Sequence, residues 1–351
     1  MPCSFVENVK IRAIATTVPK DVRTAQSHTD VFGQEGVDKF VQMVGVRERH
    51  VARESQTTAD FAADAAINVL DTLHWDRDTV DALVFVSQTP DYTLPATACL
   101  LQHRLNLSSN VLALDVNLGC SGFVYGLFIA SSLCRMPYMK RVLLLGGDTI
   151  TRLVSPTDKS SAMLFGDSGF AVALEYTEDA HEQWTCLFKT DGSGANHIIV
   201  PAGGFRNRFA SREPSLVEEG IIRSPYDLVM DGTEVFSFTI NEVPSAILEL
   251  MKAVGVTSAD IDHLVLHQAN LFILKQIAKM TKFKMEQVPV SIDRYGNTSV
   301  STIPLTLCDT FGGQADSGEK NFVFSGFGVG LSWGVIHLKL NPSVCLPISE
   351  I

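Results

Sequence analysis

The segment best suited to chemistry is Asn117–Gly126, which places one cysteine at a glycine-containing turn between two apolar segments. The run Val111–Val116 before it has the composition of a buried strand, and apolar residues at helical spacing follow it. Cys120 is therefore expected near a helix N-terminus, where unpaired backbone N–H groups and the helix dipole favour a thiolate. This makes Cys120 a candidate nucleophile, and a buried structural thiol is the alternative.

A histidine and an asparagine occupy positions that suit a site shared with Cys120. His267 directly follows the apolar run Val265–Leu266, and polar groups at the carboxyl ends of parallel strands commonly form active sites. Asn297 lies at a second glycine-containing corner. A single strand-end histidine is often only a structural residue, but three polar groups at matching ends of elements favour catalysis.

Several short patterns occur twice along the chain, in the same order and at nearly constant separation. The pairs are Asp81–Val84 with Asp262–Val265, Val142–Gly147 with Phe322–Phe327, and the strand, corner and helix around Cys120 with the segment around Asn297. This repetition indicates two similarly folded halves, which we place at residues 1–178 and 179–351.

The elements that must position these groups alternate between strand and helix. The expected elements of the first half are strands at 9–18, 81–86 and 141–147 and helices at 58–73 and 95–105. Such alternation predicts an α/β protein with a largely parallel sheet that is covered on both faces. The stretch Pro201–Pro225 has little periodicity, so we expect a surface excursion that acts as a lid.

The composition describes a well-buried globular protein without nucleic-acid or membrane partners. The chain has 351 residues, of which 46% are hydrophobic and 19% charged, and its net charge of −11 disfavours binding to nucleic acid or anionic lipid. No segment suggests a signal peptide or a membrane span. The seven cysteines form no Cys-x-x-Cys pair, which disfavours a zinc site and a disulfide framework. We expect a cytoplasmic protein with no metal ion and no cofactor.

A cysteine, a histidine and an asparagine permit two chemical schemes. In a protease-like scheme His267 would deprotonate Cys120, and Asn297 would orient the histidine. In a condensing scheme Cys120 would accept an acyl group from a thioester, while His267 and Asn297 would stabilise the enolate of a second thioester. The mirrored position of Asn297 favours the condensing scheme, because both polar groups then face the substrate.

The chain resembles the β-ketoacyl-acyl carrier protein synthase III family, whose members are thiolase-fold condensing enzymes. The motifs that carry the resemblance run in family order along nearly the whole chain. They are Gly45–His50, Cys120–Gly122, Phe165–Asp167, Glu234–Phe236, His267–Asn270, Gly296–Ser299 and Gly326–Gly330.

This resemblance implies a five-layer αβαβα fold, a homodimer, and acyl carrier protein and acyl-coenzyme A as partners. It assigns Cys120 as the acylated nucleophile, and His267 and Asn297 as the decarboxylation site. The backbone N–H groups of Cys120 and Val329 would form the oxyanion hole. The implied substrate pocket contains Phe236, Phe327, Gly328 and, from the partner subunit's copy, Leu94.

Some members of the family use acetyl-coenzyme A, and this chain differs from them at the positions that bind the nucleotide. Lys39 and Met43 stand where those relatives have tryptophan and arginine, and Phe272 stands where an arginine often follows the histidine motif. Lys159 and Lys279 match basic positions of the family. These five residues are the candidate contacts to coenzyme A or carrier protein, and the departures favour a primer other than acetyl-coenzyme A.

The leading hypothesis is decarboxylative Claisen condensation of an acyl thioester with a malonyl thioester, in fatty acid, polyketide or related acyl biosynthesis. The alternatives are acyl transfer from Cys120 to an amine, hydroxyl or thiol, and a non-catalytic partner subunit. Because Cys120, His267 and Asn297 are all present, the condensing reaction is favoured.

Overall fold

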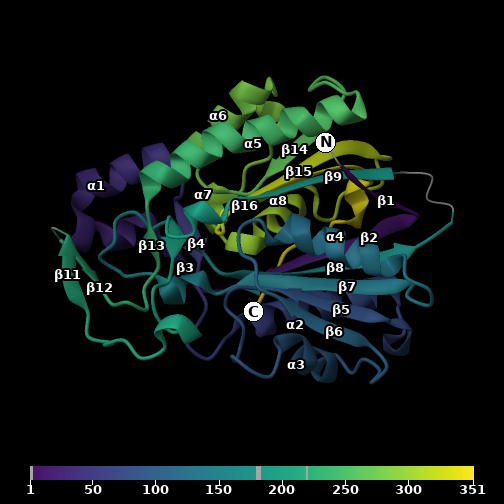
Figure 1. The fold of residues 1–351 in the computed structure, drawn as a ribbon, viewed down its shortest axis with the longest axis horizontal. Helices are drawn as coiled ribbons and strands as arrows, with labels where there is room; N and C mark the ends of the chain where they lie inside the picture. Colours follow the sequence, from purple (N-terminus) through teal and green to yellow (C-terminus); the bar gives the residue numbers. More distant parts are fainter. Residues whose placement is uncertain (1–2, 179–182, 219) are drawn as a thin grey trace.

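Two β-sheets, stacked with helices between them, form the centre of the molecule in the computed structural model, which describes residues 3–178, 183–218 and 220–351 (Figure 1). The first sheet has the order β17-β2-β8-β7-β5-β6. Its strands are β2 (Val9–Val18), β5 (Ala82–Val86), β6 (Leu112–Val116), β7 (Arg141–Asp148), β8 (Ser168–Tyr176) and β17 (Ser349–Glu350).

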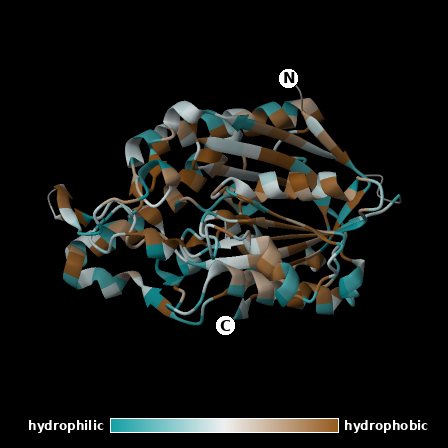
Figure 2. Ribbon diagram, turned by 60° about the horizontal axis from the view of Figure 1, so that its bottom comes forward, coloured by the Kyte–Doolittle hydropathy of each residue, from teal (hydrophilic) through white to brown (hydrophobic). Residues whose placement is uncertain are grey.

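The second sheet has the order β1-β9-β16-β15-β14. Its strands are β1 (Ser4–Glu7), β9 (Gln183–Thr190), β14 (His263–Leu266), β15 (Lys320–Gly328) and β16 (Ser332–Leu340). Strands β14 and β15 run parallel, whereas β15, β16, β9 and β1 pair antiparallel. In Figure 2 the strands are drawn largely in brown and white, while teal residues are frequent in the outer helices and loops.

Helices cover both outer faces and fill the space between the sheets. Helices α2 (Thr58–Leu73) and α3 (Thr97–Arg104) pack on the first sheet, and α5 (Gly232–Val254) and α6 (Leu271–Thr281) lie over the second (Figure 1). Helices α4 (Gly122–Cys134) and α8 (Thr302–Phe311) contact strands of both sheets. This arrangement confirms the expected five-layer αβαβα fold, and the apolar sequence of α4 explains how a helix can lie between two sheets.

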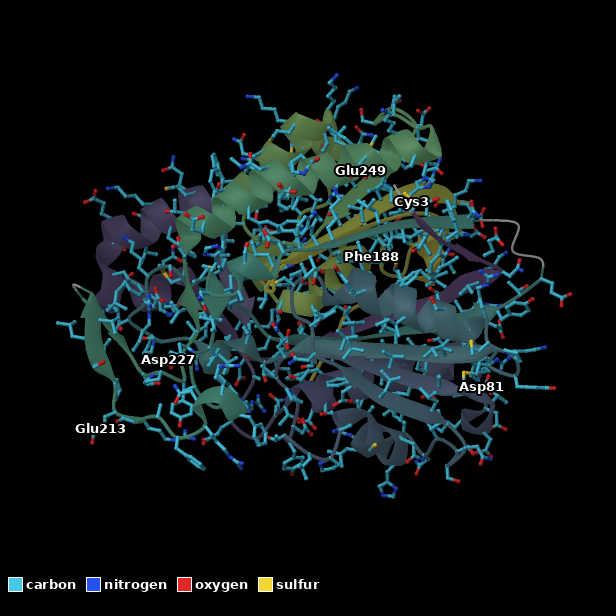
Figure 3. The ribbon with its side chains drawn as sticks, viewed as in Figure 1. Cys3, Asp81, Phe188, Glu213, Asp227 and Glu249 are labelled. Atoms are coloured by element: carbon cyan, nitrogen blue, oxygen red, sulfur yellow. The ribbon has the colours of Figure 1, made fainter. Side chains whose placement is uncertain are left out.

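The remaining α-helices and strands lie toward the carboxyl ends of the central strands (Figure 1). They are α1 (Thr29–Val44), α7 (Ile292–Tyr295) and three strand pairs, β3 (Val22–Thr24) with β4 (Glu48–His50), β10 (Ile198–Ile199) with β13 (Val229–Met230), and β11 (Ser215–Glu218) with β12 (Ile221–Arg223). Most residues of 201–217 are exposed, as expected of a surface excursion. In Figure 3, Glu213 and Asp227 are labelled on the side of the molecule where this segment lies, and Asp81 is labelled on the opposite side. None of the helices within the described ranges has both the length and the apolarity to cross a bilayer.

Local sequence accounts for several element boundaries. Helix α2 starts after Thr57, because the Asp60 carboxylate accepts a hydrogen bond from the Thr57 backbone N–H (2.7 Å) and completes a capping box. The predicted bounds of α2 and β2 agree with the observed ones. Helix α3 begins two residues later than the Pro95 start predicted, where the Asp115 carboxylate accepts hydrogen bonds from the backbone N–H groups of Thr97 and Ala98 (both 2.7 Å).

The two halves share an internal hydrogen-bond pattern. The Asp81 carboxylate accepts a hydrogen bond from the Arg141 backbone N–H (2.9 Å), and the Asp262 carboxylate accepts one from Asn321 (2.8 Å). Each bond joins a parallel strand pair, β5 with β7 and β14 with β15. This correspondence supports the predicted repetition of the fold.

Each end of the chain adds a strand to the sheet that is formed mainly by the other half of the chain. Strand β1 pairs with β9 in the second sheet, and β17 pairs with β2 in the first. The predicted division at residues 178 and 179 borders residues 179–182, which lie outside the described ranges. The division into 1–178 and 179–351 therefore stays a prediction.

The segment before Asn297 differs from the predicted repeat. The repetition predicts a strand before this corner, as before Cys120, but the structure has the one-turn helix α7 there, and α8 begins only at Thr302. Pro289 provides a physical reason, because proline has no N–H to donate to a neighbouring strand.

Candidate active site

The three candidate catalytic residues line one cavity of about 120 Å³. Cys120 comes from the turn between β6 and α4, His267 directly follows β14, and Asn297 lies between α7 and the 3-10 turn η7 (Ser299–Ser301). Cys120 and His267 therefore meet at the carboxyl ends of β6 and β14, as predicted for an α/β sheet, and Asn297 joins them from a turn. The pocket candidates Phe236, Phe327, Gly328 and Val329 line the same cavity.

Cys120 is a thiol rather than a thiolate in this environment. Burial and, next, the Asp148 carboxylate raise its pKa to about 11, against hydrogen bonds from the Ser299 hydroxyl and from the backbone N–H groups of Val329 and Cys120. The backbone N–H groups lower the pKa of Cys120, as expected at a helix start, but desolvation outweighs them and the net shift is upward. Two of those donors are the N–H groups assigned to the oxyanion hole, and both point at the sulfur.

Glycines around Cys120 allow close packing of protein groups. A β-carbon on Gly119 would lie 2.2 Å from the Gln88 side-chain oxygen, and one on Gly122 would lie 2.8 Å from a Val86 methyl group. Side chains of Gln88 and Val86, together with those of Ser299 and Val300 in η7, fill the space beside the two glycines, so a larger residue at either position would displace them.

His267 is buried, with 2% of its surface exposed, and burial lowers its pKa to about 3. Its Nδ1 atom forms a 2.7 Å hydrogen bond with the Thr302 hydroxyl, and the Phe327 ring packs edge-on against the imidazole with centroids 5.3 Å apart. The ring is therefore neutral near pH 7 and held on two sides.

The orientation of the Asn297 side chain follows from one backbone hydrogen bond. The Ser299 N–H donates to Asn297 Oδ1 (2.9 Å), so the NH₂ group is left as a hydrogen-bond donor. The Asn297 backbone is also fixed, because its N–H donates to the Leu164 carbonyl (2.9 Å) and its carbonyl accepts from the Gly166 N–H (3.1 Å). Asn297 is 5% exposed and lines the cavity, so it suits the role of a preorganised donor.

The cavity has additional walls that the sequence did not single out. Gln88 follows β5, and its position after the carboxyl end of a parallel strand was an available signal. The other walls are largely apolar and come from several separate segments, among them Ile150, Ile198, Leu228 and Met230. Ile198 and Met230 are paired residues of strands β10 and β13. Each of these strands has only two residues, which is too short to give a recognisable pattern in the sequence.

Three of the five donor-contact candidates gather around a second depression of about 540 Å³. Lys39 and Met43 lie on α1, and Lys159 faces them from the loop after β7. Lys39 forms a 2.7 Å ion pair with Glu35, and Met43 is 66% exposed. Met230 lines both this depression and the catalytic cavity, so the two are adjacent.

Phe272 and Lys279 both lie on α6, but they differ in their relation to the site. Phe272 stacks on Phe236, with ring centroids 5.7 Å apart, so it lies next to the cavity wall. Lys279 is exposed in the last turn of the helix and lines neither the cavity nor the second depression. Leu94 is 78% exposed and does not line the cavity of its own chain.

This arrangement provides a nucleophile and a set of fixed hydrogen-bond donors at one apolar cavity. Cys120 can attack a carbonyl carbon, two backbone N–H groups point at its sulfur, and Asn297 presents its NH₂ group. Donors fixed in place before the reaction stabilise developing negative charge without reorganisation. The site is therefore suited to acyl transfer and to chemistry through an enolate.

Comparison with known proteins agrees with this geometry. Residues 114–192 match the family described as 3-oxoacyl-[acyl-carrier-protein (ACP)] synthase III, and residues 251–340 match its C-terminal family. A β-ketoacyl-[acyl-carrier-protein] synthase III from Xanthomonas campestris is 37% identical over 336 residues, covering 94% of this chain and 98% of the relative. A relative of the same name from Clostridioides difficile is 34% identical over 296 residues, covering 84% and 87%.

A solved structure extends the similarity to three dimensions. The crystal structure of 3-oxoacyl-(acyl-carrier protein) synthase from Burkholderia xenovorans superposes with a TM-score of 0.94 at 37% sequence identity, covering 100% of this chain and 99% of the other. Fold, motif order and full-length similarity agree, and the chain belongs to the β-ketoacyl-[acyl-carrier-protein] synthase III family.

Proposed function

We propose that this protein catalyses the decarboxylative Claisen condensation of an acyl thioester with malonyl-acyl carrier protein, in fatty acid or related acyl biosynthesis. The observation that carries the proposal is the convergence of Cys120, His267 and Asn297 on one cavity. The names of the relatives support the same reaction.

In the first half-reaction the Cys120 sulfur attacks the carbonyl carbon of the acyl donor. A carbon–sulfur bond forms to Cys120, the bond to the donor thiol breaks, and the thiol proton of Cys120 passes to the departing sulfur. The N–H groups of Cys120 and Val329 would hold the oxyanion of the tetrahedral intermediate.

In the second half-reaction the malonyl thioester loses carbon dioxide, and the electron pair of the broken bond forms an enolate. Asn297 and His267 would donate hydrogen bonds to the enolate oxygen. The enolate carbon then attacks acyl-Cys120, the Cys120 carbon–sulfur bond breaks, and the product leaves as a β-ketoacyl thioester. The released Cys120 sulfur takes up a proton from solvent, which restores the thiol. Phe236 and Phe327 would keep the malonyl site apolar, which favours loss of the carboxylate charge.

Intact-mass analysis with acyl-coenzyme A and acyl-carrier thioesters tests the first half-reaction. We expect one acyl adduct on the wild type and none on Cys120→Ala, and an adduct that persists in the variant would overturn the assignment. Adding malonyl-acyl carrier protein should then release carbon dioxide and β-ketoacyl product. Loss of the acyl group without carbon dioxide would instead favour simple transfer to an amine, hydroxyl or thiol. Asn297→Ala should still be acylated but should not release carbon dioxide.

A homodimer is part of the proposal. Strand β6 lies at the edge of the first sheet, and its Leu112, Leu114 and Val116 side chains are only partly buried. Pairing of two such edges would cover them. Sedimentation equilibrium should give about twice the 38.3 kDa mass of one chain, and a single-chain mass at micromolar concentration would contradict the dimer. We also propose a cytoplasmic location, which fractionation of cells can test.

A further inference from the structure

The Thr302 hydroxyl and the His267 ring form a buried pair behind the catalytic cavity. Oγ1 of Thr302 lies 2.7 Å from Nδ1 of His267, and the two residues are 1% and 2% exposed. Thr302 is the first residue of α8 and does not line the cavity. Its position is fixed by the helix start, because its backbone N–H donates to the Ser299 carbonyl.

The neutral His267 ring carries a single proton, on Nδ1 or on Nε2. Because Nδ1 is engaged by Thr302 behind the cavity, Nε2 is the nitrogen left to face the substrate. Only the tautomer with a proton on Nε2 can donate a hydrogen bond to an enolate oxygen. With the proton on Nδ1, Nε2 would present a lone pair and would repel the developing negative charge.

Two groups compete to set this tautomer. The Ser299 carbonyl oxygen favours a protonated His267 ring, and it also accepts a hydrogen bond from the Thr302 hydroxyl (3.0 Å) when that hydroxyl turns toward it. The Thr302 hydroxyl has one hydrogen, which it can donate to Ser299 or to Nδ1. The Ser299 carbonyl already accepts the Thr302 backbone N–H, so it does not depend on the hydroxyl for a partner.

We propose that Thr302 is a positioning residue, which donates its hydroxyl hydrogen to Nδ1 and thereby keeps His267 in the Nε2–H tautomer required for decarboxylation. This inference deepens the proposed function and rests on it, because it concerns the half-reaction that uses the enolate. The same turn then sets both donors, since Ser299 orients Asn297 and Thr302 orients His267. Setting the tautomer through a partner on the far ring nitrogen is a general device of histidine sites.

The test compares Thr302→Val, which keeps the side-chain shape without the hydroxyl, with Thr302→Ser, which restores it. Thr302→Val should lower carbon dioxide release and condensation roughly 10- to 100-fold, with acylation of Cys120 changed less than about threefold. Thr302→Ser should recover most of the lost rate. The matched control is Thr306→Val, a buried threonine one turn along α8, whose hydroxyl bonds to the Ser291 hydroxyl and to the Thr302 backbone carbonyl but not to His267.

Nitrogen NMR of histidine-labelled protein gives a readout that does not need turnover. Comparison with His267→Asn assigns the His267 signals. We expect the wild type to show a proton on Nε2, and Thr302→Val to shift the ring toward Nδ1–H, bonded to Ser299. A wild-type ring protonated on Nδ1, or unchanged decarboxylation in Thr302→Val, would overturn the proposal. Wild-type protein that is acylated but releases no carbon dioxide would instead overturn the proposed function, and the NMR result would still report the tautomer.

Discussion

Gly328 and Cys120 lie in such close contact that a β-carbon on Gly328 would stand 3.0 Å from the Cys120 sulfur and 2.6 Å from its β-carbon. The Gly328 φ of +154° also lies outside the range that other residues readily adopt. We predict that Gly328→Ala displaces Cys120 and lowers the acylation rate by roughly 100-fold. Intact-mass time courses with an acyl-coenzyme A measure this rate.

Gly192→Ala is the matched control for this prediction, because a β-carbon there would contact nothing within 4 Å. It should acylate at the wild-type rate. Thermal unfolding should show Gly328→Ala folded but destabilised by roughly 1–3 kcal/mol, as expected for an overpacked interior. Wild-type acylation by Gly328→Ala would show that the contact does not fix the cysteine.

The raised pKa of Cys120 predicts slow alkylation at neutral pH. Because the thiolate is the reactive form and its pKa is about 11, the iodoacetamide rate should rise about tenfold for each pH unit between pH 7 and pH 10. Peptide mass spectrometry follows Cys120 separately from the exposed Cys99. A rate that levels off below pH 9 would mean that the donors around the sulfur outweigh its burial.

Phe272→Arg should improve use of a coenzyme A donor. Phe272 stacks on Phe236 beside the cavity, at the position where relatives often have an arginine, so a guanidinium there can pair with a donor phosphate. We expect KM for acyl-coenzyme A to fall roughly two- to fivefold, the range of a partly exposed ion pair, with kcat unchanged. Met280→Arg adds the same charge near the other end of α6 and should leave KM unchanged. Equal effects of the two variants would indicate a general charge effect.

Leu94 should limit primer length if its side chain enters the partner subunit's cavity. Leu94 is 78% exposed in the single chain, so enlarging it should not disturb the fold of that chain. We predict that Leu94→Phe lowers kcat/KM for the longest accepted primers roughly tenfold and spares the shortest ones. Met136→Phe, another exposed position, is the control for the added aromatic ring. An unchanged primer profile in Leu94→Phe would place Leu94 outside the acyl site.

Local patterns determined the elements and the nucleophile turn. Helix α2 and strand β2 follow directly from capping residues, periodicity and β-prone composition, which act over a few neighbouring residues. The order of the elements and the recurring patterns at Asp81 and Asp262 predicted two similarly folded halves. Each aspartate accepts a backbone hydrogen bond from the neighbouring strand, so the same local pattern produces the same contact twice. The prediction of a strand before Asn297 was wrong. It was based on the similarity to the segment around Cys120, but the segment before Asn297 contains Pro289, which disfavours a paired strand.

The sequence by itself determined which three residues are candidates, since Cys120, His267 and Asn297 each lie at an element end. Only the tertiary structure decided their chemical states. Cys120 is a thiol and His267 is neutral because packing from distant segments removes water from both, and desolvation is a property of the whole surroundings. The pairing of His267 with Thr302 has the same origin, because it joins the end of β14 to the start of α8, and no local sequence pattern reports that distance.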